Sequence, residues 1–285
     1  MECDVLFLGY GPITHAFSKK LTASGQRVIA VTETPITSTT GAEFPKSLFQ
    51  IMSWADVLNT QIQSDSTYVC WRQSPQNRVL GSEITDWVKS VNLKTNKIHH
   101  LSSASVYKGE QLVFSESDYD FYKGAARLNS KQELEALVLG ISREKQTTFV
   151  NYRISNVYGK GIRQGFINES IKNVKDHQPI CIYKNIDLIR DYLLIDDLIH
   201  ALDNLRLHRY PDEILNISTG HGVAISEVIS HLRISMSEEF KFREVEAPDE
   251  TLLRSVLSCN ILERTIPWKP QGLYESLGRL FQEMA

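Results

Sequence analysis

Two glycines near the amino terminus have the spacing of a turn that could hold a phosphate. Gly9 and Gly11 follow a short apolar run at residues 5–8 and precede residues 13–21, whose apolar side chains recur with helical spacing. In dinucleotide sites the first glycine permits a tight turn, and the second lets the backbone approach a pyrophosphate. The chemistry that this turn suggests is the binding of a nucleotide cofactor.

The residues behind these glycines affect how well the turn could bind a pyrophosphate. Thr14 stands where such turns have a third glycine, which permits close packing of helix on strand. The helix that starts at Pro12 and Ile13 still presents backbone N–H groups to a phosphate. We therefore predict that Gly9, Gly11, Pro12 and Ile13 bind the cofactor. The alternative is an ordinary strand–helix turn without a ligand.

The end of the second predicted strand bears on which cofactor would bind. Thr32 and Glu33 follow the second predicted strand, residues 27–31, which is apolar from residue 28 onward. An acidic side chain normally binds the adenosine ribose at this point, but here Thr32 occupies the place and the acid comes one residue later. Glu33 could reach the ribose hydroxyls or face solvent. Because its carboxylate would repel a 2′-phosphate and no arginine is in that turn, we expect NAD rather than NADP.

Strand and helix patterns alternate along the first half of the chain. The first run, the glycine turn, the helix and the second run make a βαβ unit, which builds parallel sheets. Further strands are predicted at residues 67–71, 97–101 and 148–154, and helices at 84–91 and 125–143. This alternation predicts an α/β fold, a Rossmann-type doubly wound parallel sheet.

The pattern changes after about residue 158, where glycines cluster and the predicted elements become shorter. Asp196 or Asp197 is expected to cap a helix that reaches about residue 207. We predict a dinucleotide-binding domain at residues 1–160 and a smaller substrate-binding lobe at residues 161–285, partly interleaved with it.

Composition limits the partners. The chain has 285 residues, a formal net charge of −3 and no basic stripe, so no nucleic-acid partner is expected. An anionic substrate would have to be held by a few placed arginines or lysines. No stretch approaches the ~20 apolar residues of a membrane span, so no membrane partner is expected either.

The cysteines bear on metal binding and location. Cys3, Cys70, Cys181 and Cys259 are widely spaced, and no cysteine–histidine cluster has metal-ligand spacing. Reduced thiols and no metal site are therefore expected. The acidic start, followed by a very short apolar run, does not have the pattern of a signal peptide. These features favour a cytoplasmic protein.

Several motifs, in order along nearly the whole chain, resemble those of one enzyme family. Residues 102–107, Ser-Ser-Ala-Ser-Val-Tyr, resemble the Ser-Ser-x-x-Val-Tyr-Gly signature of nucleotide-sugar epimerases and dehydratases. Residues 156–161, 190–198, 216–220 and 268–270 resemble its Asn-Val-Tyr-Gly-x-Gly, Arg-Asp-Phe-Ile-His-Val-Asp-Asp-Leu, Asn-(Ile/Leu)-Gly-Thr-Gly and Trp-Lys-Pro motifs. The chain is thus similar to the extended short-chain dehydrogenase/reductases, the NAD-dependent epimerase/dehydratase family.

The resemblance implies a bound nicotinamide cofactor, a nucleotide-sugar substrate and three catalytic side chains. In that family a Ser or Thr, a Tyr and a Lys act: the Tyr is acid and base on the sugar hydroxyl, and the Lys binds the nicotinamide ribose. Ser103 matches the serine. Residues 127–135 match the Tyr-x-x-Ser-Lys-x-x-x-Glu motif with Lys131 at the lysine, but Arg127 stands at the tyrosine.

Arg127 changes the expected proton chemistry. A guanidinium stays protonated at working pH, so it cannot act as a base, although it can stabilise negative charge on an oxygen. Arg127 and Lys131 share a helix face, and an anion would suit the space between them. Arg127 could instead face solvent or pair with a carboxylate. Tyr119 and Lys123 also have the Tyr-x-x-x-Lys spacing, which we interpret as coincidence, yet Tyr122 could supply the missing hydroxyl.

The resemblance also implies substrate contacts. It assigns Arg190 to the nucleotide diphosphate, for which the bidentate geometry of arginine is well suited. Asn156 is assigned to the sugar nucleotide, and a looser match assigns Arg254 to the nucleotide. Arg190 could instead form an ion pair with Asp191 or Glu213, and Asn156 could be a turn residue.

Two functions remain open. The first is an NAD-dependent nucleotide-sugar epimerase, dehydratase or reductase that transfers a hydride, with Ser103 and Lys131 in the relay beside an atypical acid/base. The second is a cofactor-binding pseudoenzyme that acts as a sensor, scaffold or regulatory partner. Arg127 and Thr14 favour the second, as does Trp71, whose bulk could narrow the nicotinamide end of the pocket.

In relatives, two helices form a four-helix dimer core across a two-fold axis. They correspond here to about residues 82–94 and 125–143. The apolar content of both segments allows a homodimer of this kind.

Overall fold

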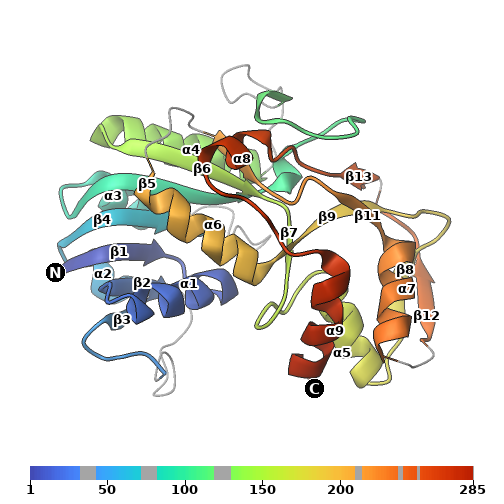
Figure 1. Cartoon of the computed structure of the whole chain (residues 1–285). Coiled ribbons are helices and arrows are strands. Elements are labelled where there is room, and N and C mark those ends of the chain that lie inside the picture. Colours follow the sequence, from blue (N-terminus) through green and yellow to red (C-terminus); the bar gives the residue numbers. More distant parts are fainter. Residues whose placement is uncertain are drawn as a thin grey trace. The chain divides into compact units, whose positions relative to one another are not determined.

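The computed structural model describes residues 1–32, 43–71, 82–118, 130–208, 214–236, 240–248 and 251–284. The chain divides into two compact units, which Figure 1 shows with their elements labelled. Unit 1 comprises residues 1–106, 120–153 and 206–215, and unit 2 comprises residues 107–119, 154–205 and 216–285.

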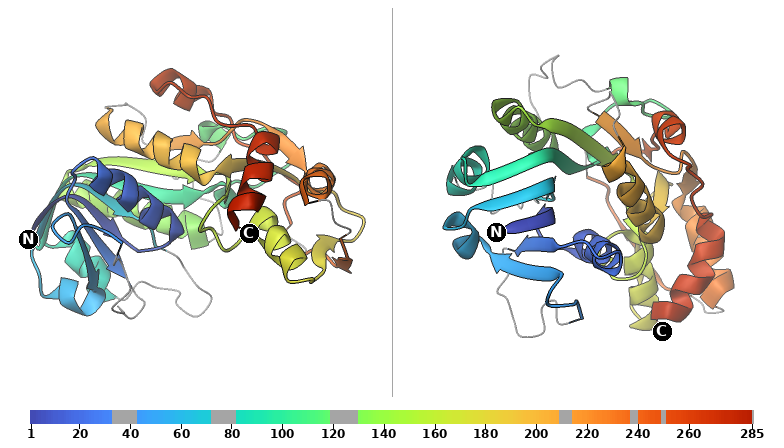
Figure 2. Two further views of the ribbon diagram at one scale, coloured as in Figure 1. Left: turned by 60° about the horizontal axis from the view of Figure 1, so that its bottom comes forward. Right: turned by 60° about the vertical axis from the view of Figure 1, so that its left-hand side comes forward.

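Unit 1 is built on a seven-stranded sheet with the strand order β10-β6-β5-β4-β1-β2-β3. The neighbouring strands β5-β4-β1-β2-β3 of this order pair in parallel, as the sequence predicts for a doubly wound sheet. Figure 2 shows α3 and α4 on one side of this sheet and α1 on the other. The element bounds are β1 (Glu2–Leu8), α1 (Pro12–Ala23), β2 (Val28–Thr32), β3 (Phe49–Ser53), α2 (Trp54–Leu58), β4 (Ile62–Val69), α3 (Ser82–Lys89), β5 (Leu93–Ser103), η1 (Ala104–Val106), α4 (Ser130–Lys145), β6 (Thr148–Ile154) and β10 (Ile214–Ile217).

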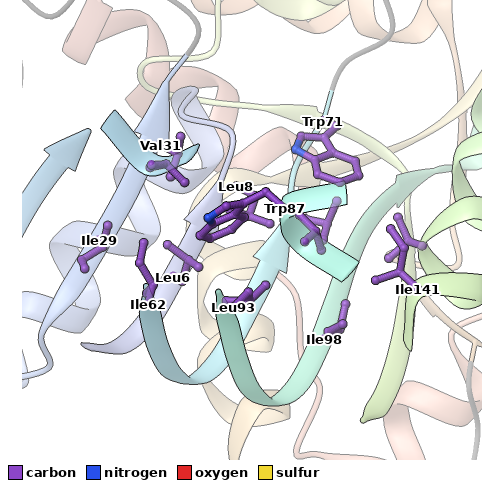
Figure 3. Packing of buried hydrophobic residues seen from close by; sticks show 14 of the residues in the cluster. Leu6, Leu8, Ile29, Val31, Ile62, Trp71, Trp87, Leu93, Ile98 and Ile141 are labelled. Carbon is purple, nitrogen blue, oxygen red and sulfur yellow. The ribbon is translucent and has the colours of Figure 1, made fainter. Parts of the chain in front are cut away.

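The central strands of unit 1 carry buried apolar runs, because helices cover both faces of the sheet. Along β1, Leu6 and Leu8 belong to the buried cluster that Figure 3 shows, together with Trp87 of α3 and Ile141 of α4. Phe7 points to the opposite face, where the centroid of its ring lies 5.7 Å from the ring centroid of Phe17 in α1. The predicted Rossmann-type α/β fold is confirmed.

Unit 2 contains smaller sheets. One has the order β11-β9-β13 with β7 also paired to β9, and β12 pairs with β8. A second buried cluster, which includes Tyr158, Leu194 and Leu277, holds its helices together. The element bounds are η2 (Glu116–Asp118), β7 (Asn156–Tyr158), α5 (Phe166–Lys175), β8 (Ile180–Tyr183), β9 (Ile189–Leu194), α6 (Ile195–Leu207), β11 (Gly222–Ala224), α7 (Ile225–Met236), β12 (Phe242–Val245), β13 (Arg254–Ser255), α8 (Asn260–Thr265) and α9 (Leu273–Met284).

The elements differ from the sequence predictions in several places. The edge strand β3 was not predicted, because an edge strand is half exposed and Gln50 interrupts its apolar pattern. The α6 helix begins at Ile195, so Asp196 and Asp197 lie in its first turn and neither is the N-cap. The helix predicted at residues 125–143 is observed as α4, and residues 125–129 lie outside the described residues. No helix in the described ranges has the length and apolar character needed to cross a membrane.

Candidate functional site

The glycine turn after β1 requires a glycine at only one of its two positions for steric reasons. Gly9 has φ +115°, and a Cβ there would lie 2.7 Å from the backbone oxygen of Cys70. Gly11 has φ −155°, an extended conformation that any residue adopts. A Cβ on Gly11 would meet nothing within 4 Å. The protein therefore leaves open the space beside Gly11 that a ligand could approach.

The start of α1 offers two backbone donors. The Gly11 N–H donates to the Thr14 hydroxyl at 2.8 Å, and Pro12 has no N–H. The N–H groups of Ile13 and Thr14 have no hydrogen-bond partner among the described residues. Free N–H groups at a helix start bind anions, so two donors are available to a phosphate.

Beside the glycine turn lies a polar cluster that the sequence analysis missed. The Tyr10 hydroxyl is 2.8 Å from Nδ1 of His15, whose Nε2 is 3.7 Å from a carboxylate oxygen of Glu43. Lys19 pairs with the other Glu43 oxygen at 3.2 Å. Burial raises the pKa of Tyr10 to about 12 and lowers the pKa of His15. No local pattern could reveal the cluster, because Glu43 is far from α1 along the chain and meets His15 and Lys19 only in the folded protein.

Only one of the two residues predicted to bind the adenosine ribose lies in the described part of the chain. Thr32 ends β2 with a side chain only 3% exposed. Glu33 lies outside the described residues. Trp71, which follows β4, is 3% exposed and belongs to the buried cluster of Figure 3. Its ring packs among apolar side chains of the core, and its effect on the nicotinamide end of a pocket stays a prediction.

Ser103 stands at the end of β5, and its hydroxyl is ready to donate. Its Oγ accepts hydrogen bonds from the backbone N–H of Ser105 at 3.3 Å and from the Ser105 hydroxyl at 3.2 Å. Its own proton has no acceptor among the described residues, so it is available to an oxygen of a ligand. Lys131 lies in the first turn of α4. Arg127 and Tyr122 lie outside the described residues.

A buried ion pair lies one helical turn from Lys131 and beside Ser102, the neighbour of Ser103. The Arg153 guanidinium donates to both Glu135 oxygens, at 3.2 Å from Nε and 2.9 Å from Nη2, and both side chains are 0% exposed. The Ser102 hydroxyl also donates to Glu135. Ser102 thus bonds a residue 33 positions away in the chain, whereas Ser105 bonds its near neighbour Ser103.

His100, on the same face of β5 as Ser102, is a histidine that burial keeps neutral. His100 Nδ1 is 2.7 Å from Oδ1 of Asn151, and an amide oxygen only accepts, so Nδ1 carries the proton. Burial lowers the pKa of His100 to about 4.

In unit 2, two arginines lie on neighbouring strands. Arg254 of β13 is in register with Ile189 of β9, the residue before Arg190. The Arg190 guanidinium donates to the carbonyls of Leu252 at 2.7 Å and Leu253 at 3.2 Å. Arg254 donates from Nε to a backbone carbonyl at 2.6 Å. Among the described residues, no carboxylate pairs with either guanidinium.

Asp191 does not neutralise Arg190. Its carboxylate accepts the Thr219 N–H and hydroxyl, at 3.0 and 2.8 Å, and the Gly220 N–H at 3.0 Å. The alternative ion pair between Arg190 and Asp191 is therefore wrong, and Glu213 lies outside the described residues. Asn156, whose side chain is exposed, donates from Nδ2 to the Asp191 carbonyl at 3.1 Å. Asn156 thus starts β7 with its amide oxygen available to a ligand.

Comparison with known proteins agrees with this arrangement. The chain is 28% identical over 142 residues to dTDP-4-dehydro-6-deoxyglucose reductase of Escherichia coli, a match that covers 48% of this chain and 45% of that protein. It is 24% identical over 192 residues to CDP-abequose synthase of Salmonella typhimurium, covering 62% of this chain and 63% of that protein. The chain thus spans less than two-thirds of the length of either relative.

The fold also has close counterparts among solved structures. The structure of MoeE5 in complex with UDP-glucose and NAD superposes with a TM-score of 0.80 at 20% identity, covering 99% of this chain and 98% of that one. A model of one protein family, described as the NAD dependent epimerase/dehydratase family, matches residues 9–218. This match extends from the glycine turn to β10 and covers well over half of the chain. The chain therefore belongs to the NAD dependent epimerase/dehydratase family.

Proposed function

We propose that this protein binds NAD and a nucleotide sugar and acts as an epimerase, dehydratase or reductase. The observation that carries the proposal is the glycine turn after β1. It combines open space beside Gly11 with two N–H donors at the start of α1 that have no partner among the described residues. That combination fits a pyrophosphate. Family membership and the complexes named for MoeE5 support the same choice of ligands.

The cofactor would be held at three points of unit 1. The backbone from Gly9 to Ile13 would bind the pyrophosphate, and Lys131 the nicotinamide ribose. Thr32 and Glu33 would bind the adenosine ribose, and the Glu33 carboxylate disfavours a 2′-phosphate, hence NAD over NADP. Bound NAD supplies a nicotinamide ring that takes up or gives a hydride.

The substrate diphosphate would be held by unit 2. Arg190 and Arg254 provide two guanidinium groups without a carboxylate partner among the described residues, and such groups bind phosphate oxygens strongly. Asn156 would contact the sugar nucleotide through its amide oxygen, which has no donor among the described residues. The relatives act on dTDP- and CDP-linked sugars by their names, so the nucleotide of this protein is open to test.

Proton transfer would differ from that of relatives with a tyrosine. Ser103 would donate its free proton to a substrate oxygen and so orient it. Arg127 would stabilise negative charge on that oxygen but cannot accept a proton. Tyr122 is the candidate for the missing acid and base.

Calorimetric titration of the purified protein tests this function. NAD, NADH, NADP and NADPH are titrated alone and with UDP- or dTDP-sugars, and we expect NAD to bind more tightly when a nucleotide sugar is present. Lys131→Ala should weaken NAD binding, whereas Lys172→Ala, at an exposed position of α5, should not. Failure of all four dinucleotides to bind at millimolar concentration would contradict the proposal.

Arg127 at the tyrosine position favours a second candidate function, that of a pseudoenzyme that binds the cofactor as a sensor, scaffold or regulatory partner. An activity assay distinguishes this pseudoenzyme from the enzyme. NAD and a nucleotide sugar would bind, but no NADH absorbance and no altered sugar would form over long incubation.

The proposed homodimer would use the exposed face of α4. Ala136 is exposed there, and a Cβ on Gly140, one turn later, would meet nothing within 4 Å. Small side chains let two helices approach closely. Analytical ultracentrifugation should give twice the chain mass of 32.5 kDa, and a monomer at all concentrations would exclude this contact. We place the reaction in the cytoplasm, where the four free cysteines would stay reduced.

A further inference from the structure

One buried carboxylate joins the elements that carry the predicted catalytic residues. Glu135 lies one helical turn after Lys131 on α4 and binds Arg153 of β6 through both oxygens. It also accepts the hydroxyl proton of Ser102, the neighbour of Ser103 on β5. A shift of α4 along the sheet would break all three hydrogen bonds.

A second contact from α4 reaches the other side of Ser103. The buried Gln132 side chain donates from Nε2 to the Val106 carbonyl at 2.8 Å. Glu135 binds the residue before Ser103, and Gln132 binds η1 three residues after it. The backbone of Ser103 is thus held between two side chains of the helix turn that carries Lys131.

Stability alone does not account for the ion pair. Both Glu135 and Arg153 are fully buried, so each charge has lost its hydration. Apolar side chains of similar volume often stabilise a fold as well as a buried ion pair, or better. What apolar side chains cannot supply is direction, because a bidentate guanidinium–carboxylate pair fixes the distance and the orientation of its two partners.

We propose that Glu135 and Arg153, with Ser102, are positioning residues that set Lys131 and Ser103 in the geometry needed to bind the cofactor and orient the substrate. All three are buried, so they would act through Lys131 and Ser103 and not by touching a ligand. This inference rests on the proposed function, because Lys131 is taken to hold the nicotinamide ribose.

The test uses an apolar triple variant, Ser102→Ala/Glu135→Leu/Arg153→Met, which keeps the side-chain volumes similar and removes the directional bonds. The control variant, Lys89→Met/Glu144→Leu, removes a partly exposed ion pair of 2.9 Å that joins α3 to the last turn of α4. Thermal unfolding and NAD binding by calorimetry are measured for both. We expect the triple variant to fold and to bind NAD about 10- to 100-fold more weakly, because even a small misplacement of a side chain that positions a ligand reduces its effect by about this factor. The control should bind as the wild type does.

A double-mutant cycle with Lys131→Ala separates positioning from a general loss of structure. If the buried cluster acts through Lys131, Lys131→Ala will weaken NAD binding much less in the triple variant than in the wild type. Equal fold-losses in the two backgrounds overturn the inference, as does a folded triple variant that binds NAD like the wild type. If the triple variant does not fold, Glu135→Asp, which shortens the carboxylate by one methylene, takes its place in the same cycle.

The wild-type titration keeps the two proposals apart. If the wild type binds NAD and the cycle is additive, only the positioning role fails. If the wild type binds no dinucleotide, the proposed function fails and the positioning role fails with it.

Discussion

The hydroxyl of Thr14 hydrogen-bonds both polar backbone groups of Gly11. It accepts the Gly11 N–H at 2.8 Å and donates to the Gly11 carbonyl at 3.0 Å. A third glycine at this position could make neither bond. The glycine turn is therefore closed by a side chain, and the phosphate donors are shifted to the N–H groups of Ile13 and Thr14.

Removing this hydroxyl should destabilise the fold. Thr14→Ala leaves a backbone N–H at the helix start without its partner, and the loss of such a cap costs about 1 kcal/mol of unfolding free energy. Thr14→Ser retains the hydroxyl and should lose less. Urea unfolding measures both variants, and equal stabilities for Thr14→Ala and the wild type would show that the hydrogen bonds contribute nothing.

The two glycines of the turn should respond differently to alanine. Gly9→Ala forces an alanine into φ +115° with its Cβ 2.7 Å from a backbone oxygen, so the folded state should lose about 1–3 kcal/mol or more. Gly11→Ala meets no protein atom within 4 Å and should change stability by less than about 1 kcal/mol.

The same pair separates folding from ligand binding. Gly11→Ala places a methyl group where the pyrophosphate would approach, so its NAD affinity should fall although its unfolding curve changes little. Calorimetry and urea unfolding on the same samples make the comparison. Unchanged NAD affinity in Gly11→Ala would show that no pyrophosphate approaches this turn.

Arg190 should act on the substrate and not on the cofactor. Arg190→Met removes a guanidinium that lacks a carboxylate partner in the described structure, and hydrogen bonds to charged groups contribute about 1.5–3 kcal/mol. UDP- or dTDP-sugar binding should weaken about 10- to 100-fold, while NAD binding stays constant. Arg264→Met, at an exposed position of α8, is the matched control. A loss of NAD affinity equal to that for the sugar would contradict the assignment to the diphosphate.

Burial of His100 makes stability depend on pH. Its pKa is about 4 in the folded chain and 6.5 when unperturbed, so between these values the unfolded chain binds a proton that the folded chain does not. Stability must then fall as the pH drops through this range. The part lost between pH 7.5 and pH 5 is about 2 kcal/mol for this one histidine.

Urea unfolding at these two pH values tests this expectation. His100→Leu/Asn151→Leu removes both polar partners and should lose less stability on acidification than the wild type does. His208→Leu, at an exposed position, should keep the wild-type pH dependence. If the double variant loses as much stability as the wild type, His100 does not carry the effect.

The sequence by itself determined the βαβ plan of unit 1 and the place of the glycine turn. Strands buried on both faces are largely apolar, as residues 28–31 of β2 are, so their positions are visible as apolar runs in the sequence. Gly9 could be recognised because a tight turn with positive φ demands glycine locally. The half-exposed edge strand β3 carries no such local signal.

Only the tertiary structure decided which side chains meet. Ser102 and Glu135 are 33 residues apart, and Glu135 and Arg153 are 18 apart. The Glu135–Arg153 ion pair and the Ser102 hydrogen bond therefore form only after α4 packs on β5 and β6. In the same way, the sheet face that Trp71 takes placed it in the core, and the partners of Arg190 proved to be carbonyls. The physical reason is that periodicity determines which elements form, whereas the partner of each polar side chain depends on how distant elements pack.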